Sequence, residues 1–199
     1  EVQAEGPWLL AGWSDGAVIA YEMARQTESP GGAPSLVALL DPPAPPKGCG
    51  VDVTTLLLGF ATLAGGYSEQ KREAVRALLE GLDVEAGLDL LIELAQADGE
   101  LPADVGRSWM RERFDLHRRT SIAVETYVPR PYGGSVILVR ADASLAAGAA
   151  DLAAGWGSLA RIDAHLVPGA NHFSLLQPPV LDRWVEHLKS SLAAFEGKS

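Results

Sequence analysis

A serine flanked by two glycines, between a predicted strand and a predicted helix, is the feature that most constrains this chain. An apolar run from Trp8 leads into residues 12–16, Gly-Trp-Ser-Asp-Gly, and apolar side chains then recur at helical spacing as far as Ala24. Strand, Gly-x-Ser-x-Gly and helix in this order predict a nucleophile elbow, a strained turn that lifts the serine hydroxyl clear of a sheet. We expect glycine at 12 and 16 because this turn brings their backbones together. Ser14 is therefore the predicted nucleophile, with an ordinary helix N-cap as the alternative.

The composition narrows the class of protein. A chain of 199 residues, 47% of them hydrophobic, fits one globular domain. A formal net charge of −10 argues against nucleic acids and anionic membranes as partners, and no apolar run reaches the roughly 18 residues of a membrane span. The single cysteine, Cys49, excludes an internal disulfide, fits a cytoplasmic location and is predicted to be structural or incidental. No cluster of metal ligands stands out, so we expect neither a metal nor a cofactor bound by this chain.

Three further apolar runs predict the other strands of a mostly parallel sheet flanked by helices. Residues 35–40, 135–140 and 164–167 have the composition of buried strands, and residues 179–195 form an amphipathic helix pattern. Asp41 and Asp142 follow the first two of these strands. Polar residues at the carboxyl ends of parallel strands lie on the functional edge of an α/β sheet, so we predict a site there.

A helical stretch interrupts this α/β pattern. Amphipathic helices are predicted over residues 53–64, 68–82, 84–97 and 104–126. We interpret residues 47–126 as a helical lid inserted into a core made of 1–46 and 127–199. The alternative is a helical subdomain without a gating role, and the arginines of its last helix then form a solvated face.

The position of the elbow near the start of the chain conflicts with its expected place in a sheet. A strand that carries such a serine is buried on both faces and needs a neighbour on each side. Only 13 residues precede Ser14, and the acidic opening EVQAEG has no strand pattern. We therefore expect that N-terminal strands of the complete fold are missing from this chain.

His172 is the candidate base for the serine. It follows the last predicted strand in a Gly/Asn loop, and Ser, Asp, His is the chain order of α/β-hydrolases. His117 lies within a helix pattern, His165 within a strand pattern and His187 on the final helix, so we expect these three to be structural. Asp41 and Asp142 both qualify as the carboxylate that orients His172, and their positions alone do not separate them.

The chain resembles a known family in four segments: GWSDGAVIAYEMARQ, SLVALLD, YVPRPYGGSVILVRAD and GANHFSLL. These are similar to the type I thioesterase domains that end nonribosomal peptide synthetases and polyketide synthases, members of the α/β-hydrolase superfamily. The resemblance implies Asp41 as the acid, with Asp142 as the alternative, and the backbone N–H of Asp15 as one oxyanion donor. The loop that supplies the second donor has no counterpart here, and Ala17 stands where the peptide-synthetase members usually have glycine.

The resemblance also implies a reaction. Ser14 would attack the thioester of a peptidyl or polyketide chain carried on the phosphopantetheine of an upstream carrier protein domain. The acyl-serine would then be released by hydrolysis or macrocyclisation, in secondary-metabolite (antibiotic-type) biosynthesis. Three alternatives stay open: a discrete editing (type II) thioesterase, another α/β-hydrolase esterase, and a non-catalytic binding module.

Overall fold

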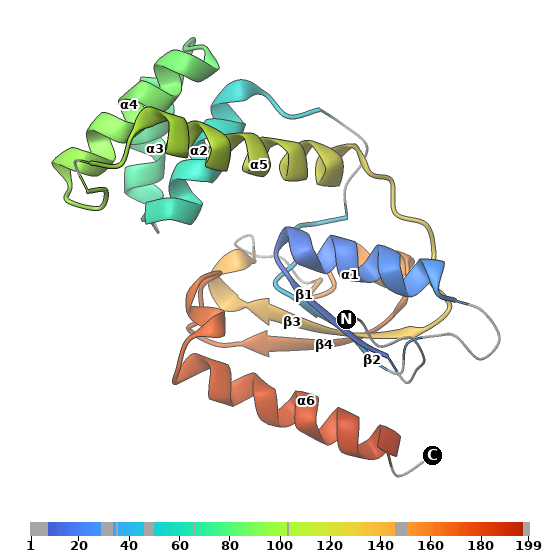
Figure 1. Ribbon diagram of the computed structural model, residues 1–199. Helices are drawn as coiled ribbons and strands as arrows, with labels where there is room; N and C mark the ends of the chain where they lie inside the picture. Colours follow the sequence, from blue (N-terminus) through green and yellow to red (C-terminus); the bar gives the residue numbers. More distant parts are fainter. Residues whose placement is uncertain are drawn as a thin grey trace. The chain divides into compact units, whose positions relative to one another are not determined.

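The computed structural model describes residues 8–28, 34, 36–45, 50–65, 67–102, 104–145 and 151–196. The chain divides into two compact units, one of Glu1–Lys47 with Tyr127–Ser199 and the other of Gly48–Thr126 (Figure 1). Cys49, for which the sequence predicts a structural or incidental role, lies outside the described residues. None of the helices within the described ranges combines the length and apolar character needed to cross a membrane.

The first unit is built on a parallel sheet, as predicted. Its strands are β1 (Leu9–Trp13), β2 (Leu36–Leu40), β3 (Ser135–Ala141) and β4 (Arg161–Val167), in the order β1-β2-β3-β4. All three pairings are parallel, and the register places Trp13 beside Leu40, and Ala141 beside Val167. The carboxyl ends of the strands therefore meet at one edge of the sheet.

β1, which leads into Ser14, is an outer strand of the sheet within the described residues. Leu9 at its start is 56% exposed, whereas Val37, Ala38 and Leu39 on the neighbouring β2 are at most 1% exposed. A strand that carries an elbow serine is expected to have a neighbour on each side, and residues 1–7 lie outside those described.

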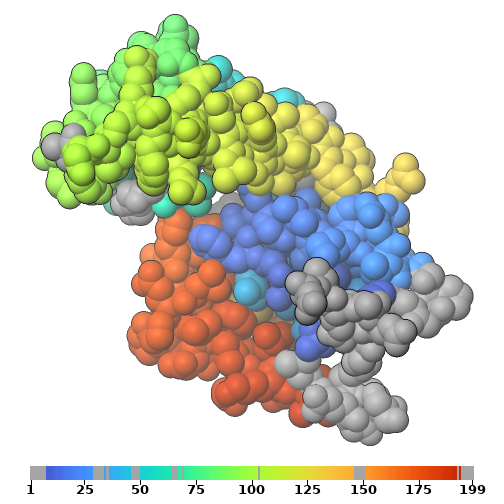
Figure 2. Space-filling view, in the orientation of Figure 1, coloured from blue at the N-terminus to red at the C-terminus, as the bar shows by residue number. Residues whose placement is uncertain are grey.

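Helices α1 (Asp15–Gln26) and α6 (Val180–Glu196) lie on opposite faces of the sheet (Figure 1). The buried side of α1 is rich in alanine, which lets the helix approach the strands closely. The hydroxyl of its Tyr21 lies 2.8 and 3.0 Å from the carbonyl oxygens of Arg130 and Leu159 and can donate to either of them. Part of α1 (blue) is visible on the face of the molecule drawn in Figure 2, and its Ile19 and Met23 are each 50% exposed.

A second part of the core fills the space between the sheet and α6. Trp184 of α6 is 6% exposed, and its indole N–H donates to the Leu175 carbonyl oxygen at 2.8 Å. Alternate strand residues face this layer, as the two-residue period of a strand requires. The buried members are Ala38, Leu40, Ile137, Val139, Ala141, Val167, Ala170, Leu175 and Trp184.

The second unit is helical and has a core of its own. Its helices are α2 (Val53–Gly65), α3 (Glu69–Leu79), α4 (Val84–Ala97) and α5 (Arg107–Thr126). Its buried cluster consists of Leu56, Leu57, Leu58, Phe60, Ala61, Tyr67, Val75, Leu79, Leu88, Leu91, Met110 and Phe114. The predicted helices agree with these bounds except at two ends: α3 ends at Leu79, before Gly81 with its left-handed φ of 77°, and α5 begins at Arg107, three residues after its predicted start.

Candidate active site

Ser14 occupies the strained turn between β1 and α1. Its φ of 56° and ψ of −129° lie in a region that side chains with a Cβ rarely adopt. Two backbone hydrogen bonds hold Ser14 in this conformation. The Ser14 N–H donates to the Leu40 carbonyl, and the Ser14 carbonyl accepts from the Ala17 N–H, both at 2.9 Å. The geometry is that of a nucleophile elbow.

The two glycines of the elbow are not equivalent. A Cβ added at Gly12 would lie 2.0 Å from the backbone oxygen of Gly16, so the turn excludes any side chain at position 12. A Cβ added at Gly16 would meet nothing within 4 Å. The prediction that close approach of the two backbones requires glycine therefore holds for position 12 and is wrong for position 16. Only a side chain at position 12 would collide with the backbone of the other residue.

Asp41 follows β2 and is 2% exposed. It has a left-handed φ of 44°, and its N–H donates to the Val139 carbonyl at 2.7 Å. Its Oδ1 accepts the Ala141 N–H at 3.1 Å, and its Oδ2 accepts the Ser144 hydroxyl at 2.5 Å. The same Oδ2 lies 2.7 Å from Nδ1 of His172. The structure thus brings Asp41 and His172 together across 131 positions of the chain.

Asp142, the alternative acid, lies in the 3-10 turn Asp142–Ser144 directly after β3. Its side chain is exposed, and its Oδ2 accepts the backbone N–H of Gly169 at 3.3 Å. Within the described residues, the hydrogen bonds and ion pairs join His172 to Asp41 and not to Asp142.

The environment of Asp41 favours its ionised form. Burial raises the pKa of this carboxyl, but hydrogen bonds from His172, Ser144 and the Ala141 backbone outweigh burial and hold the pKa below its usual value. A charged carboxylate that accepts a hydrogen bond from Nδ1 fixes the imidazole tautomer, so that Nε2 is the nitrogen available to take a proton.

The loop after β4 holds His172 in place. The side-chain oxygen of Asn171 accepts the N–H groups of Phe173 and Ser174 at 3.0 and 2.8 Å, which closes a tight turn around the histidine. The ring of His172 stacks on Trp13, the residue before the elbow serine, with 4.7 Å between centroids. The Trp13 indole N–H also donates to the His172 carbonyl at 3.2 Å.

Arg140 is a buried cation that the sequence reasoning did not single out. It is 5% exposed, donates from Nη1 to the Pro42 carbonyl, and places Nε 4.0 Å from Oδ1 of Asp41. Burial lowers the pKa of its guanidinium, and the charge of Asp41 opposes that shift. The sequence did contain a sign of this residue's importance, namely an arginine at the end of an otherwise apolar strand. A charged side chain that is buried in such a strand needs a partner nearby.

One cavity of about 560 Å³ contains all three predicted catalytic side chains. Ser14, Asp41 and His172 line it, although no hydrogen bond joins Ser14 to His172 within the described residues. Its remaining lining combines apolar and polar groups: Pro42, Pro43, Ala44, Arg140, Ser144, Leu145, Asp151 and Ala154. The volume is typical of a pocket for a small organic ligand.

The other histidines lie outside this cavity. His117 of α5 contacts the rings of Phe60 and Phe114 in the helical unit, with centroids 5.8 and 6.5 Å away. His165 of β4 and His187 of α6 contact each other, with centroids 3.3 Å apart. Burial lowers the pKa of His165, and the neighbouring His187 lowers it further.

The parallel sheet with flanking helices and the elbow define a protein of the α/β-hydrolase class. The sequence profile of the Thioesterase domain family matches residues 1–192, and the chain belongs to this family. The resemblance found in the sequence is thereby confirmed.

Two of the curated relatives are polyketide synthases. A non-reducing polyketide synthase of Pseudevernia furfuracea is 25% identical over 206 residues, which cover 97% of this chain. Non-reducing polyketide synthase PKS16 of Cladonia grayi is 29% identical over 184 residues, 89% of this chain. The chain spans only 9% of the length of each of these relatives.

Solved structures share the fold. A four-domain nonribosomal peptide synthetase bound to AMP and glycine matches 95% of this chain over 14% of its own, with a TM-score of 0.75 and 26% identity. The Vlm2 thioesterase domain bound with a dodecadepsipeptide matches 90% of this chain over 67% of its own, with a TM-score of 0.59 and 21% identity.

Proposed function

We propose that this chain is the acyl-transfer unit that releases a peptidyl or polyketide chain from a carrier protein, through an acyl-Ser14 intermediate. The observation that carries the proposal is the contact of 2.7 Å between Asp41 and His172 in a cavity that Ser14 also lines. Family membership supports thioester chemistry, and the polyketide synthases and peptide synthetase among the similar proteins support a tethered substrate.

In this mechanism, Nε2 of His172 takes the proton of the Ser14 hydroxyl as the serine oxygen attacks the thioester carbonyl. Asp41, held charged by its hydrogen bonds, stabilises the imidazolium that forms. The tetrahedral intermediate collapses with cleavage of the C–S bond, and His172 returns the proton to the departing thiol. Water, or a hydroxyl or amine of the acyl chain, then attacks the acyl-serine by the same path in reverse.

The start of α1 supplies the proposed oxyanion site. Asp15 is the first residue of α1, so its backbone N–H belongs to the positive end of the helix. A donor at this position stabilises the tetrahedral oxyanion, and removal of one such donor costs about 3 kcal/mol of barrier in serine hydrolases.

We further propose that the helical unit acts as the lid of this site. Its insertion after β2 begins a few residues beyond Asp41, and it has a core of its own, as a lid that moves as one body would need. If it limits the access of water, replacing residues 50–126 by a short linker should raise the ratio of hydrolysed to cyclised product. An unchanged ratio in a variant that still turns over would argue for a helical subdomain without a gating role.

Substrate choice tests the proposed function. We expect turnover of an acyl thioester of N-acetylcysteamine, and faster turnover of the same acyl group on a phosphopantetheinylated carrier protein. The matched control is the oxygen ester of the same acyl group. Faster turnover of the free ester than of either thioester would instead assign the chain to the esterases, and binding without turnover of any of the three would assign it to the binding modules.

A further inference from the structure

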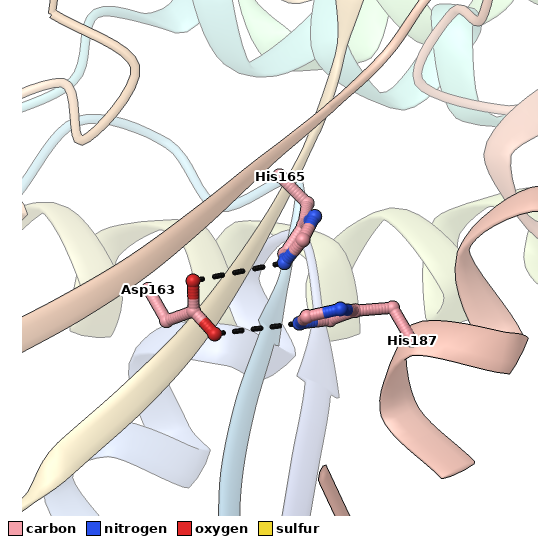
Figure 3. A group of neighbouring side chains, drawn as sticks. All are labelled: Asp163, His165 and His187. Atoms are coloured by element: carbon pink, nitrogen blue, oxygen red, sulfur yellow. Dashed lines mark ion pairs between the residues drawn. The ribbon is translucent and has the colours of Figure 1, made fainter. Parts of the chain in front are cut away.

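Three potential metal ligands meet on the α6 side of the sheet. Asp163 and His165 are two positions apart on β4, so their side chains project from the same face of the strand. His187 reaches them from α6 (Figure 3). These residues are absent from the lining of the Ser14 cavity, so the cluster is a separate feature of the first unit.

The carboxylate faces one nitrogen of each ring. Oδ1 of Asp163 lies 3.7 Å from Nε2 of His165, and Oδ2 lies 3.3 Å from Nε2 of His187 (Figure 3). One ligand atom from each of the three residues falls within 4.8 Å of the others. The side chains thus converge on a single point between β4 and α6.

Among the residues that the structure describes, the two imidazole nitrogens lack hydrogen-bond partners. Nε2 of His165 and Nε2 of His187 are both buried, and neither has a hydrogen bond within the described part of the chain. Buried polar atoms of side chains are rarely left unsatisfied, because each costs about 1–3 kcal/mol. Two such atoms, aimed at the same carboxylate, indicate that a further group belongs between them.

We propose that Asp163, His165 and His187 bind a zinc ion. Two imidazoles and one carboxylate are a ligand set that suits Zn²⁺ and related borderline divalent ions. In a tetrahedral zinc site with bonds of about 2.0–2.1 Å, neighbouring ligand atoms lie about 3.3 Å apart. The Asp163–histidine separations of 3.3 and 3.7 Å are close to that spacing, and the two rings, with centroids 3.3 Å apart, have to move apart for both nitrogens to bind one ion.

The site has an open position and joins two elements. Asp163 is 62% exposed in its side chain and each histidine is 32% exposed, so a water molecule can take the fourth position. Because the ligands come from β4 and α6, a bound ion would link α6 to β4, the strand at the edge of the sheet within the described residues. Metal binding should consequently stabilise the folded chain.

Zinc titration of the full chain tests this proposal. The chain, freed of any affinity tag and dialysed against a chelator, should bind one Zn²⁺ tightly in isothermal titration calorimetry and show a higher Tm with zinc. Co²⁺ in place of Zn²⁺ should give the intense visible absorption of a tetrahedral site. His187→Gln and His165→Gln should weaken affinity by at least the roughly 10–100-fold that loss of an outer-shell partner costs.

Two matched controls separate this site from adventitious binding. Glu186→Gln changes an exposed carboxylate on the same helix, and His117→Gln removes a histidine of the helical unit. Both should retain the tight site. Absence of stoichiometric binding, or tight binding that survives both His165→Gln and His187→Gln, would overturn the proposal, and circular dichroism of these variants shows that loss of binding is not loss of the fold. Activity of Ser14 plays no part in the readout, so the outcome does not depend on the proposed function.

Discussion

Trp13 and His172 are stacked with 4.7 Å between ring centroids, and the Trp13 indole N–H donates to the His172 carbonyl at 3.2 Å. The residue before the elbow serine therefore positions the proposed base directly. This contact links the two segments that carry the chemistry, the β1–α1 turn and the loop after β4.

Replacing Trp13 should lower turnover through the position of His172. Trp13→Phe keeps an aromatic stack but loses one hydrogen bond, and a typical net value of 0.5–1.5 kcal/mol predicts a decrease in kcat of about 2–10-fold. Trp13→Ala also loses the stack and should be slower still. Steady-state kinetics on an N-acetylcysteamine thioester measure both, with Trp109→Phe, an exposed indole of α5, as the control. Wild-type kcat in Trp13→Ala would show that the stack does not position the histidine.

The elbow makes opposite predictions for its two glycines. Gly12→Ala places a methyl group 2.0 Å from the Gly16 carbonyl oxygen, and we expect a loss of unfolding free energy of about 3 kcal/mol or more. Gly16→Ala adds its methyl group in open space at the second position of α1, where alanine favours the helix, and should be neutral or stabilising. Urea denaturation of the two variants measures both changes in unfolding free energy. Equal stabilities would mean that the turn is not as tight as the structure shows.

The two candidate acids are distinguished by a matched pair of substitutions. Asp41→Asn removes the charge that faces His172 and allows the wrong imidazole tautomer, which in a serine protease lowers kcat by roughly 10⁴-fold. We expect a decrease of this order here, and a change within about twofold for Asp142→Asn. The kcat values of both variants, with folding verified by circular dichroism, check this assignment. A larger loss in Asp142→Asn than in Asp41→Asn would reverse it.

Glu22 on α1 makes stability depend on acid pH. Hydrogen bonds from Arg25, and further ones from Tyr127 and Gln26, lower the pKa of Glu22 to about 2. Because the folded pKa lies below the ordinary value of about 4.3, this contribution is complete above that value and is lost as the pH falls toward 2.

Glu22→Gln should therefore cost about 1 kcal/mol at pH 7, after discounting for solvent screening. The difference from wild type should shrink between about pH 5 and pH 2. Urea denaturation across this pH range measures it, and Glu112→Gln, at an exposed position of α5, is the control. A pH-independent difference would show that the carboxylate acts by packing rather than by charge.

Much of the fold could be predicted because the hydrophobic periodicity and the capping residues indicated the same helices and strands. The predicted helix over residues 84–97 matches α4, whose N-cap Asp83 accepts the Ala86 N–H at 2.9 Å. β4, by contrast, begins at Arg161, three residues before its predicted start. Arg161 and Asp163 are exposed, and such polar residues on an outer strand hide the apolar run on which the prediction depended.

Some residues of the candidate sites could likewise be proposed from the sequence, and others could not. Local patterns single out Ser14 and His172 as candidates, but Asp41 and Asp142 both follow strands. Only the family resemblance favoured Asp41, and the structure shows that Asp41 is the one that contacts His172. The cluster of Asp163, His165 and His187 was missed because its third member comes from a helix 22 positions after His165. Proximity of that kind is set by how α6 packs on the sheet, which periodicity does not encode.

Mass spectrometry of the full chain after reaction with an acyl-N-acetylcysteamine thioester tests the central claim most directly. We predict an acyl mass on the proteolytic peptide that contains Ser14, and its absence in Ser14→Ala. Because His172 is the proposed base for both formation and resolution of the acyl-serine, the adduct is sought in wild type at short reaction times. An adduct on another residue, or an adduct that survives Ser14→Ala, would contradict the assignment of Ser14 as the nucleophile.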